Sequence, residues 1–165
     1  MEAGKESTRQ AYELTLDMFG VLEEVREMAA MMRKVRSYDE ARSSLRELTN
    51  RHLTSKSGLE ATISNKSVDK ILSGKAIGKS ASKEAHFLAV ANLERLFSNA
   101  IEPFEFPFDP EKSNENYLEI KRLYAPMAFV KRIIPVKFTV MVMRNEREGK
   151  RIYSLEAINV DLDKK

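Results

Sequence analysis

The first part of the chain repeats its apolar positions with the period of an α-helix. Between Thr8 and Arg36 these positions recur at spacings of three and four and form one stripe, which consists of Tyr12, Leu16, Phe19, Leu22, Val25, Ala29, Met32 and Val35. This pattern predicts one long helix, and methionines at 18, 28, 31 and 32 give it an adaptable apolar surface. Packing within the chain and a seam with a protein partner or second copy both explain the stripe.

A serine cap predicts where the next helix begins. Ser37 and Glu40 have the spacing of a capping box, in which each side chain can bond a backbone N–H of the other residue. We expect a helix that runs from there to about Asn50. Its inward positions would be Ala41, Leu45 and Leu48.

Two further serine caps predict two more helices. Ser64 would begin a short helix, which Gly74 would end as the residue after the C-cap. Ser80 or Ser82 would begin a longer helix over about 83–100, whose apolar face includes Val90, Leu93 and Phe97.

The second half of the chain changes to strand periodicity. Prolines exclude a helix from 101–110, where we expect extended chain whose phenylalanines enter the core. Residues 117–124 fit a strand or a short helix, whereas 129–143 and 151–160 read as two strands. The charged loop between them contains Gly149, so an antiparallel hairpin is expected.

This order of elements predicts an α+β fold, in which N-terminal helices pack on a small antiparallel sheet formed by the C-terminal half. We expect an N-terminal helical arm or hairpin over 1–50 and an α+β domain over 51–165.

Composition excludes several kinds of protein and site. The 165 residues contain no run of about 20 apolar residues, so we expect no membrane span. The N-terminus lacks the pattern of a secretory signal, and we expect a cytoplasmic protein. With no cysteine and only His52 and His86, we expect no metal site and no cofactor.

Charge is segregated along a chain whose net charge is only +3. Five lysines lie between Lys66 and Lys83 against Asp69 alone, and no acid occurs from Ile120 to Asn145. Within the second region, Lys137 and Thr139 would share one face of a strand whose other face carries Val136, Phe138 and Val140. Such a face suits phosphate and therefore nucleic acid, although each charged block also fits an ordinary solvated surface.

Several short patterns occur in a familiar order. The first block contains Leu59-Glu-Ala-Thr-Ile-Ser64, Lys70-Ile-Leu-Ser73, Lys79-Ser80 and His86-Phe-Leu-Ala-Val-Ala-Asn-Leu-Glu-Arg-Leu-Phe97; the second contains Tyr124-Ala-Pro126, Val136-Lys-Phe-Thr-Val140 and Gly149-Lys-Arg-Ile-Tyr-Ser-Leu-Glu-Ala157. Over about 45–160 the chain resembles a small domain of large polyvalent and portal-associated (MuF-type) proteins of phages and conjugative elements. That domain is similar to the barnase–EndoU–colicin–RelE class of nucleases.

The resemblance implies RNA as the target and a metal-independent ribonuclease as the enzyme, so 51–165 would be nuclease-like. The catalytic residues that it implies are His86, Lys137, Thr139, Tyr153 and Glu156, with Ser154 binding the substrate. Lys79, Ser80 and Arg132 are added as substrate-binding residues from their charge and position. Because such domains also occur as accessory modules, the alternative is a non-enzymatic binding or assembly module that acts through the methionine-rich N-terminal helix.

Two of these candidates have equally simple structural roles. His86 can titrate near neutrality as an acid or base, but it shares a helical face with Val90 and Leu93, as a core histidine would. Glu156 needs a partner, and Lys137 across the hairpin would make either a structural ion pair or a base beside a cation. An enzyme would need His86 and Lys137 to converge within about 8 Å in an open cleft.

Overall fold

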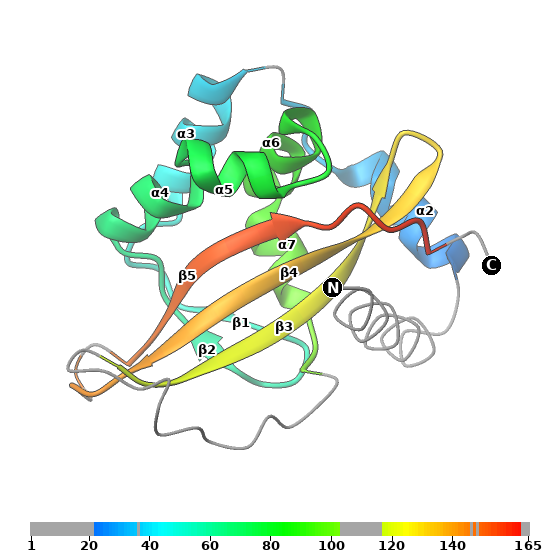
Figure 1. The fold of residues 1–165 in the computed structure, drawn as a ribbon. Coiled ribbons are helices and arrows are strands. Elements are labelled where there is room, and N and C mark those ends of the chain that lie inside the picture. The colour runs from blue at the N-terminus through cyan, green and yellow to red at the C-terminus, as the bar shows by residue number, and fades with distance from the viewer. Residues whose placement is uncertain (1–21, 36, 103–116, 146, 148, 163–165) are drawn as a thin grey trace.

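The computed structural model describes residues 22–35, 37–102, 117–145, 147 and 149–162 (Figure 1). Its elements are α2 (Leu22–Met31), α3 (Tyr38–Glu47), β1 (Leu53–Thr54), β2 (Glu60–Ala61), α4 (Asn65–Ile71), α5 (Gly74–Lys79), α6 (Lys83–Ala91), α7 (Leu93–Ser98), β3 (Tyr117–Phe129), β4 (Arg132–Met143) and β5 (Lys150–Ala157). None of the helices in this part of the chain combines the length and apolar composition that a bilayer crossing requires.

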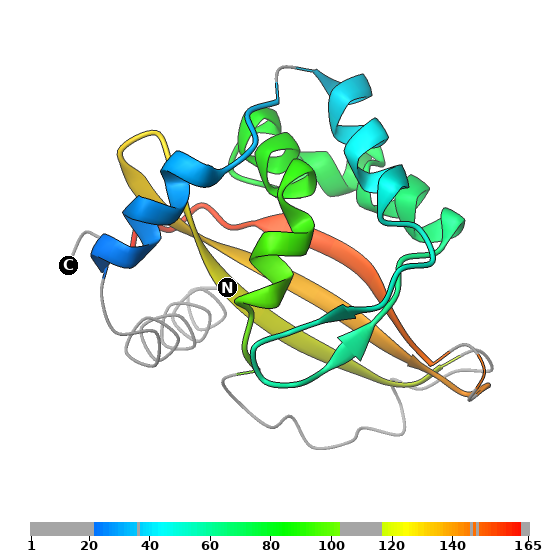
Figure 2. The ribbon, with the colours of Figure 1, turned by 180° about the vertical axis from the view of Figure 1, so that it is seen from behind.

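Strands β3, β4 and β5 form an antiparallel sheet in sequence order. One face of the sheet, here called the inner face, packs in a hydrophobic cluster with α3, α4, α6 and α7 and carries Leu123, Ala125, Val136, Phe138, Val140, Ile152 and Leu155. Figures 1 and 2, which view the molecule from opposite sides, show these helices gathered on one side of the sheet. The fold is therefore α+β, with N-terminal helices on a C-terminal antiparallel sheet, as the sequence predicted.

The serine caps are confirmed. Ser37 accepts a hydrogen bond from the Glu40 N–H at 3.2 Å, and Ser64 accepts one from Ser67 at 3.2 Å. Ser82, rather than Ser80, caps α6. These local bonds explain why the helix starts could be placed from sequence alone.

Gly74 does not end a helix, contrary to the prediction. Ser73 caps α5, its hydroxyl accepting from the Ala76 N–H at 3.1 Å, and Gly74 is the first residue of that helix. The chain therefore turns from α4 into α5 at Ser73.

Asn92 breaks the helix that was expected over 83–100 into α6 and α7. Its buried side-chain amide donates to the Leu88 carbonyl at 2.9 Å and to the Arg33 carbonyl at 2.8 Å. It also accepts from the Arg33 N–H at 2.7 Å. The Asn92 amide thus bonds both backbone groups of Arg33, which would otherwise be free to continue the helix. This explains why α2 ends at Met31 rather than near Arg36.

The region 117–124 is strand, and β3 continues to Phe129, where a two-residue turn leads into β4. The strand that was predicted over 129–143 therefore starts too early: Phe129 is the last residue of β3, and β4 begins at Arg132. Val130 and Lys131 both have positive φ, 48° and 47°, as a type I′ hairpin turn requires. The turn was missed because neither residue is glycine, asparagine or aspartate.

The described part of the N-terminal stripe packs within the chain. Val25 lies in a small cluster with Tyr124, Ile133 and Leu162, while Met32 belongs to the main core. Residues 8–21 of the predicted helix, and the phenylalanines of 101–110, lie outside the described residues.

The free edge of β5 is covered near both of its ends. Thr62, which follows β2, bonds the backbone on either side of Arg151: its N–H donates to the Lys150 carbonyl and its carbonyl accepts from Ile152. At the other end the Ala81 N–H donates to the Ala157 carbonyl at 2.7 Å. These bonds hold α4, α5 and α6 beside β5.

Candidate nucleic-acid interface

The outer face of the sheet, opposite the inner face, carries polar side chains in register. Lys137 on β4 lies directly across from Glu156 on β5, and Thr139 lies across from Ser154. These four side chains are partly exposed. Directly paired residues share a face and bring their Cβ atoms close together. The register therefore makes one cluster of four candidates that were chosen from sequence.

Lys137 and Glu156 form the expected ion pair, with 3.2 Å between Nζ and Oε2. Each side chain is 27% exposed, so water still reaches both groups. An ion pair with this much solvent exposure contributes at most about 1 kcal/mol to stability. A phosphate could therefore replace Glu156 as the partner of the Lys137 ammonium at little cost in free energy. The Thr139 and Ser154 hydroxyls would be further hydrogen-bond donors to it.

Register adds two cations that the sequence analysis did not select. Arg122 on β3 pairs with Thr139, and Arg151 on β5 pairs with Met141, so both belong to the outer face. The acid-free region pointed to Arg122, but only the strand pairing assigns its face. The pairing of Arg151 depends on an irregularity in β5 next to Tyr153, which alternation alone does not foresee.

Tyr124, an aromatic residue of this face, is too deeply buried to stack on a base. Tyr124 pairs with Lys137, but only 5% of its surface is exposed because it packs against Val25 and Ile133. Around Lys137 the face therefore offers charges and hydroxyl groups. Such groups contact the nucleic-acid backbone rather than the bases.

His86 is wholly buried, and both of its ring nitrogens have partners. Nε2 lies 2.7 Å from the Ile71 carbonyl oxygen, which can only accept, so Nε2 carries the proton. Nδ1 then accepts from the Ser80 hydroxyl at 2.7 Å, and the Ser80 oxygen accepts from the Ala157 N–H at 3.0 Å. One imidazole thus connects α4, α6 and β5.

Burial lowers the pKa of His86 below its ordinary value, because desolvation disfavours the charged ring. The hydrogen bond to Ile71 and the charge of Glu156 act in the opposite direction and are weaker. The ring is therefore held neutral.

His86 does not join Lys137 in an open cleft. The imidazole has no exposed surface, whereas Lys137 lies on the outer face, between residues 136 and 138 that point into the core. The structure brings together Lys137, Thr139, Ser154 and Glu156, and it leaves His86 and Ser80 in the interior hydrogen-bond chain.

The remaining candidates lie elsewhere. Lys79 is exposed at the end of α5. Tyr153 lies at the irregularity of β5, where its hydroxyl accepts from Lys70 Nζ of α4. Arg132 lies at the start of β4, and its Nη2 donates to the Asn159 side chain at 3.3 Å.

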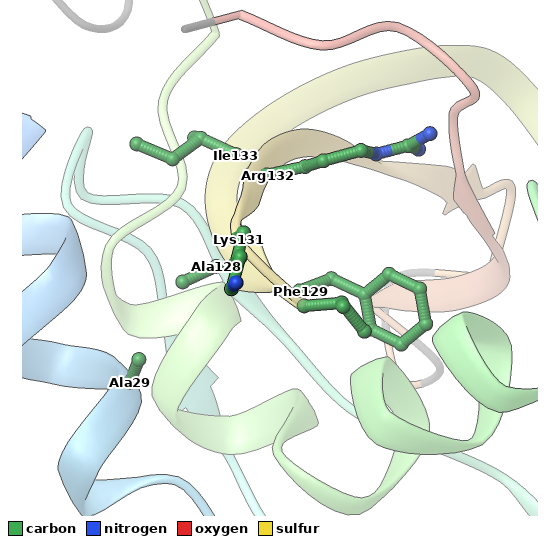
Figure 3. Close-up of a pocket in the computed structure, with 7 residues that line it drawn as sticks. Ala29, Ala128, Phe129, Lys131, Arg132 and Ile133 are labelled. Carbon is green, nitrogen blue, oxygen red and sulfur yellow. The ribbon is translucent and has the colours of Figure 1, made fainter.

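Arg132 also lines a mainly apolar cavity of about 440 Å³ between α2 and the turn from β3 to β4 (Figure 3). Ala29 faces the turn from α2, and Arg132 and Ile133 extend in opposite directions from their strand. The other lining residues are Ala128, Phe129, Val130 and Lys131. This cavity lies apart from the cluster on β4 and β5, so Arg132 does not contribute to that cluster.

Within the described residues, no three His, Asp or Glu side chains gather where they could hold a metal ion.

Comparison with models of known protein families gives a match. The family model for large polyvalent protein-associated domain 3 matches residues 32–153, which is more than two thirds of the chain. The matched region includes Lys137 and Thr139 and ends before Ser154 and Glu156. No curated protein and no solved structure matches the chain.

Proposed function

The chain belongs to the family of large polyvalent protein-associated domain 3, and from this premise we propose that it engages RNA through the outer face of β4 and β5. The observation that carries the proposal is the cluster of Lys137, Thr139, Ser154 and Glu156, which is partly exposed and in register. In this proposal the protein is a phage or mobile-element domain whose binding is chiefly to phosphate.

The charge of the outer face supports a polyanionic ligand. Among the described residues, the outer face carries Arg122, Lys137 and Arg151 together with Glu156. Since a solvated ion pair is weak, Lys137 can exchange its carboxylate for a phosphate oxygen. Phosphate contacts of this kind position a nucleic acid but read little sequence.

Cleavage of the bound RNA is the finer candidate, and the pairing of Glu156 with Lys137 favours it. A carboxylate beside an ammonium and two hydroxyl groups could act as the base while the cation binds the phosphate. His86 has no exposed surface through which to act as the acid. We therefore propose binding as the function and treat cleavage as a separate outcome.

The alternative, assembly through the N-terminal helix, receives less support. Val25 and Met32 are buried within this chain, and among the α2 residues whose exposure is described Met31 is the large exposed one, at 65%. The described part of that helix therefore offers little surface for an interface, and residues 8–21 of the predicted helix lie outside the described residues.

The test is binding of a labelled single-stranded RNA in EDTA at low salt. We expect Lys137→Gln to weaken binding roughly three- to tenfold, because one phosphate contact is removed. Lys75→Gln, which removes an exposed charge on α5, should leave binding unchanged. Equal binding by wild type and Lys137→Gln would contradict the proposal.

The same samples report cleavage. Fragments formed by wild type and lost in Glu156→Gln would assign a base to Glu156, since the amide keeps the shape but cannot accept a proton. Intact RNA in every sample would leave binding as the function.

A further inference from the structure

A second cavity lies where α4 faces β5 and the end of β4. Its volume is about 340 Å³, and its lining consists of Ser64, Lys66, Ser67, Lys70, Met141, Met143, Arg151 and Tyr153. Three of these residues are cations, three carry hydroxyl groups and two are methionines. None of the described lining residues is an acid, so this part of the lining favours an anionic ligand.

The nearest acid in sequence is already engaged. Asp69 lies between the lysines of α4, but its Oδ1 is 2.8 Å from Nη2 of Arg42 on α3. Its carboxylate is therefore engaged by the neighbouring helix α3. The lysine-rich block that resembled a solvated surface thus supplies two charges to a concave site.

The hydroxyl groups are held in place by the fold. The Oγ atoms of Ser64 and Ser67 lie 3.1 Å apart at the start of α4, and Ser67 is buried. Across the cavity, Lys70 Nζ donates to the Tyr153 hydroxyl and lies 4.6 Å from the centre of its ring. This contact joins the two side chains across the cavity.

Met141 and Met143 add an apolar wall to the polar site. Thioether side chains are polarisable and pack well against flat rings. A site with cations and hydroxyl groups beside such a wall matches a ligand that is anionic at one end and flat and apolar at the other.

We propose that this cavity binds the phosphate-bearing end of a nucleotide. The phosphate would lie among Lys66, Lys70 and Arg151, and the base would lie against Met141 and Met143. The volume is near the lower end of the range for ligand sites, roughly 300 to 1,000 Å³, and so suits one nucleotide rather than several.

The cavity is continuous with the outer face, because Met141 and Arg151 pair there directly. The choice of a nucleotide among phosphate-bearing ligands rests on the proposed function. The anionic character of the ligand rests on the lining alone.

The experiment measures binding of uridine 5′-monophosphate and of uridine by calorimetry at low salt. We expect the monophosphate to bind at least about tenfold more tightly than uridine, because charge-assisted hydrogen bonds to phosphate are strong. Lys66→Gln/Lys70→Gln should weaken monophosphate binding by about tenfold or more. The matched double variant Lys75→Gln/Lys83→Gln, at two exposed lysines outside the cavity, should bind like wild type.

Three results would overturn the proposal: no monophosphate binding by the folded wild-type protein, equal binding of uridine, or wild-type affinity in Lys66→Gln/Lys70→Gln. Lys137→Gln separates this proposal from the proposed function, since it should bind the monophosphate normally. If it also binds RNA normally, the RNA proposal fails while the nucleotide site stands.

RNA carrying either a 5′-phosphate or a 5′-hydroxyl identifies the source of the phosphate. Preference for the phosphorylated end, lost in Lys66→Gln/Lys70→Gln, would assign the site to RNA ends. Equal binding of both RNAs, with monophosphate binding retained, would assign it to free nucleotides.

Discussion

At the scale of single residues, His86 shows how a candidate for catalysis can serve the fold. Its imidazole connects the Ile71 carbonyl with the Ser80 hydroxyl, which in turn holds the Ala157 N–H of β5. Burying a neutral imidazole with both nitrogens hydrogen-bonded costs little free energy, whereas burying the charged ring costs much. His86 is accordingly suited to hold α4, α6 and β5 together.

We predict that this histidine makes stability depend on pH. The folded pKa lies below the unfolded value of about 6.5, so the stabilisation is complete above that pH. As the pH falls below the unfolded pKa, the unfolded chain binds a proton at this histidine and the folded chain does not. The free energy of unfolding then falls by up to about 1.4 kcal/mol per pH unit.

Urea unfolding of wild type and His86→Gln at about pH 7.5 and about pH 5.5, roughly one unit either side of the unfolded pKa, tests this. The variant should lose the slope that depends on His86, while every other titratable group is the same in both proteins. Parallel stability curves for the two proteins would contradict the prediction.

At the scale of elements, Asn92 decides where two helices end. Its side chain makes three hydrogen bonds to backbone groups, two of them to Arg33, a residue distant in sequence. We predict that Asn92→Ala destabilises the protein by about 2 to 4 kcal/mol, because buried backbone groups lose their partners.

Denaturant unfolding measures this effect, with Asn65→Ala at an exposed position as the control. A loss no larger than that of the control would show that water replaces the Asn92 amide.

The turn between β3 and β4 is an element held in an unfavourable conformation. Val130 is β-branched and 74% exposed, yet it has positive φ, as does Lys131. Left-handed backbone costs such residues about 1 to 2 kcal/mol each. Residues of this kind often mark functional positions.

We therefore predict that Val130→Asn/Lys131→Gly raises the free energy of unfolding by about 1 to 2 kcal/mol. The reverse change at Gly149, which has φ of 62° and open space at its Cβ position, should destabilise: Gly149→Ala should cost about 1 kcal/mol. Thermal unfolding of both variants checks the pair, and a fall in melting temperature for the first would contradict the explanation.

At the scale of the whole molecule, the sheet separates two kinds of surface. Its inner face completes a core that includes Met32 and Leu45 as well as β3 to β5, so core contacts cross residue 50, where the sequence suggested a boundary. Its outer face gathers Arg122, Lys137 and Arg151 from three different strands.

This arrangement predicts the salt dependence of RNA binding. If the three outer-face cations each contact one phosphate, log K should fall against log salt with a slope of about −2 for single-stranded RNA. Lys137→Gln should reduce the magnitude of that negative slope by about 0.7. A slope near zero in a salt titration would show that phosphate contacts do not drive binding.

The sequence anticipated the features that depend on neighbouring residues. The caps at Ser37 and Ser64, the inward positions Ala41 and Leu45, and the β4–β5 hairpin all follow from local hydrogen bonding or from periodicity. The pairing of Lys137 with Glu156 was also anticipated, because strand alternation and a carboxylate in need of a partner suffice to suggest it.

What the sequence by itself determined was therefore that helices come first and the sheet last, the α+β class and the faces of β4. Tertiary structure alone decided that Asn92 ends two helices, that Val130 and Lys131 form a turn, and that His86 is enclosed. The physical reason is that each of these depends on groups distant along the chain: an amide that bonds another helix, strand pairing that enforces a strained turn, and partners from three elements around one imidazole.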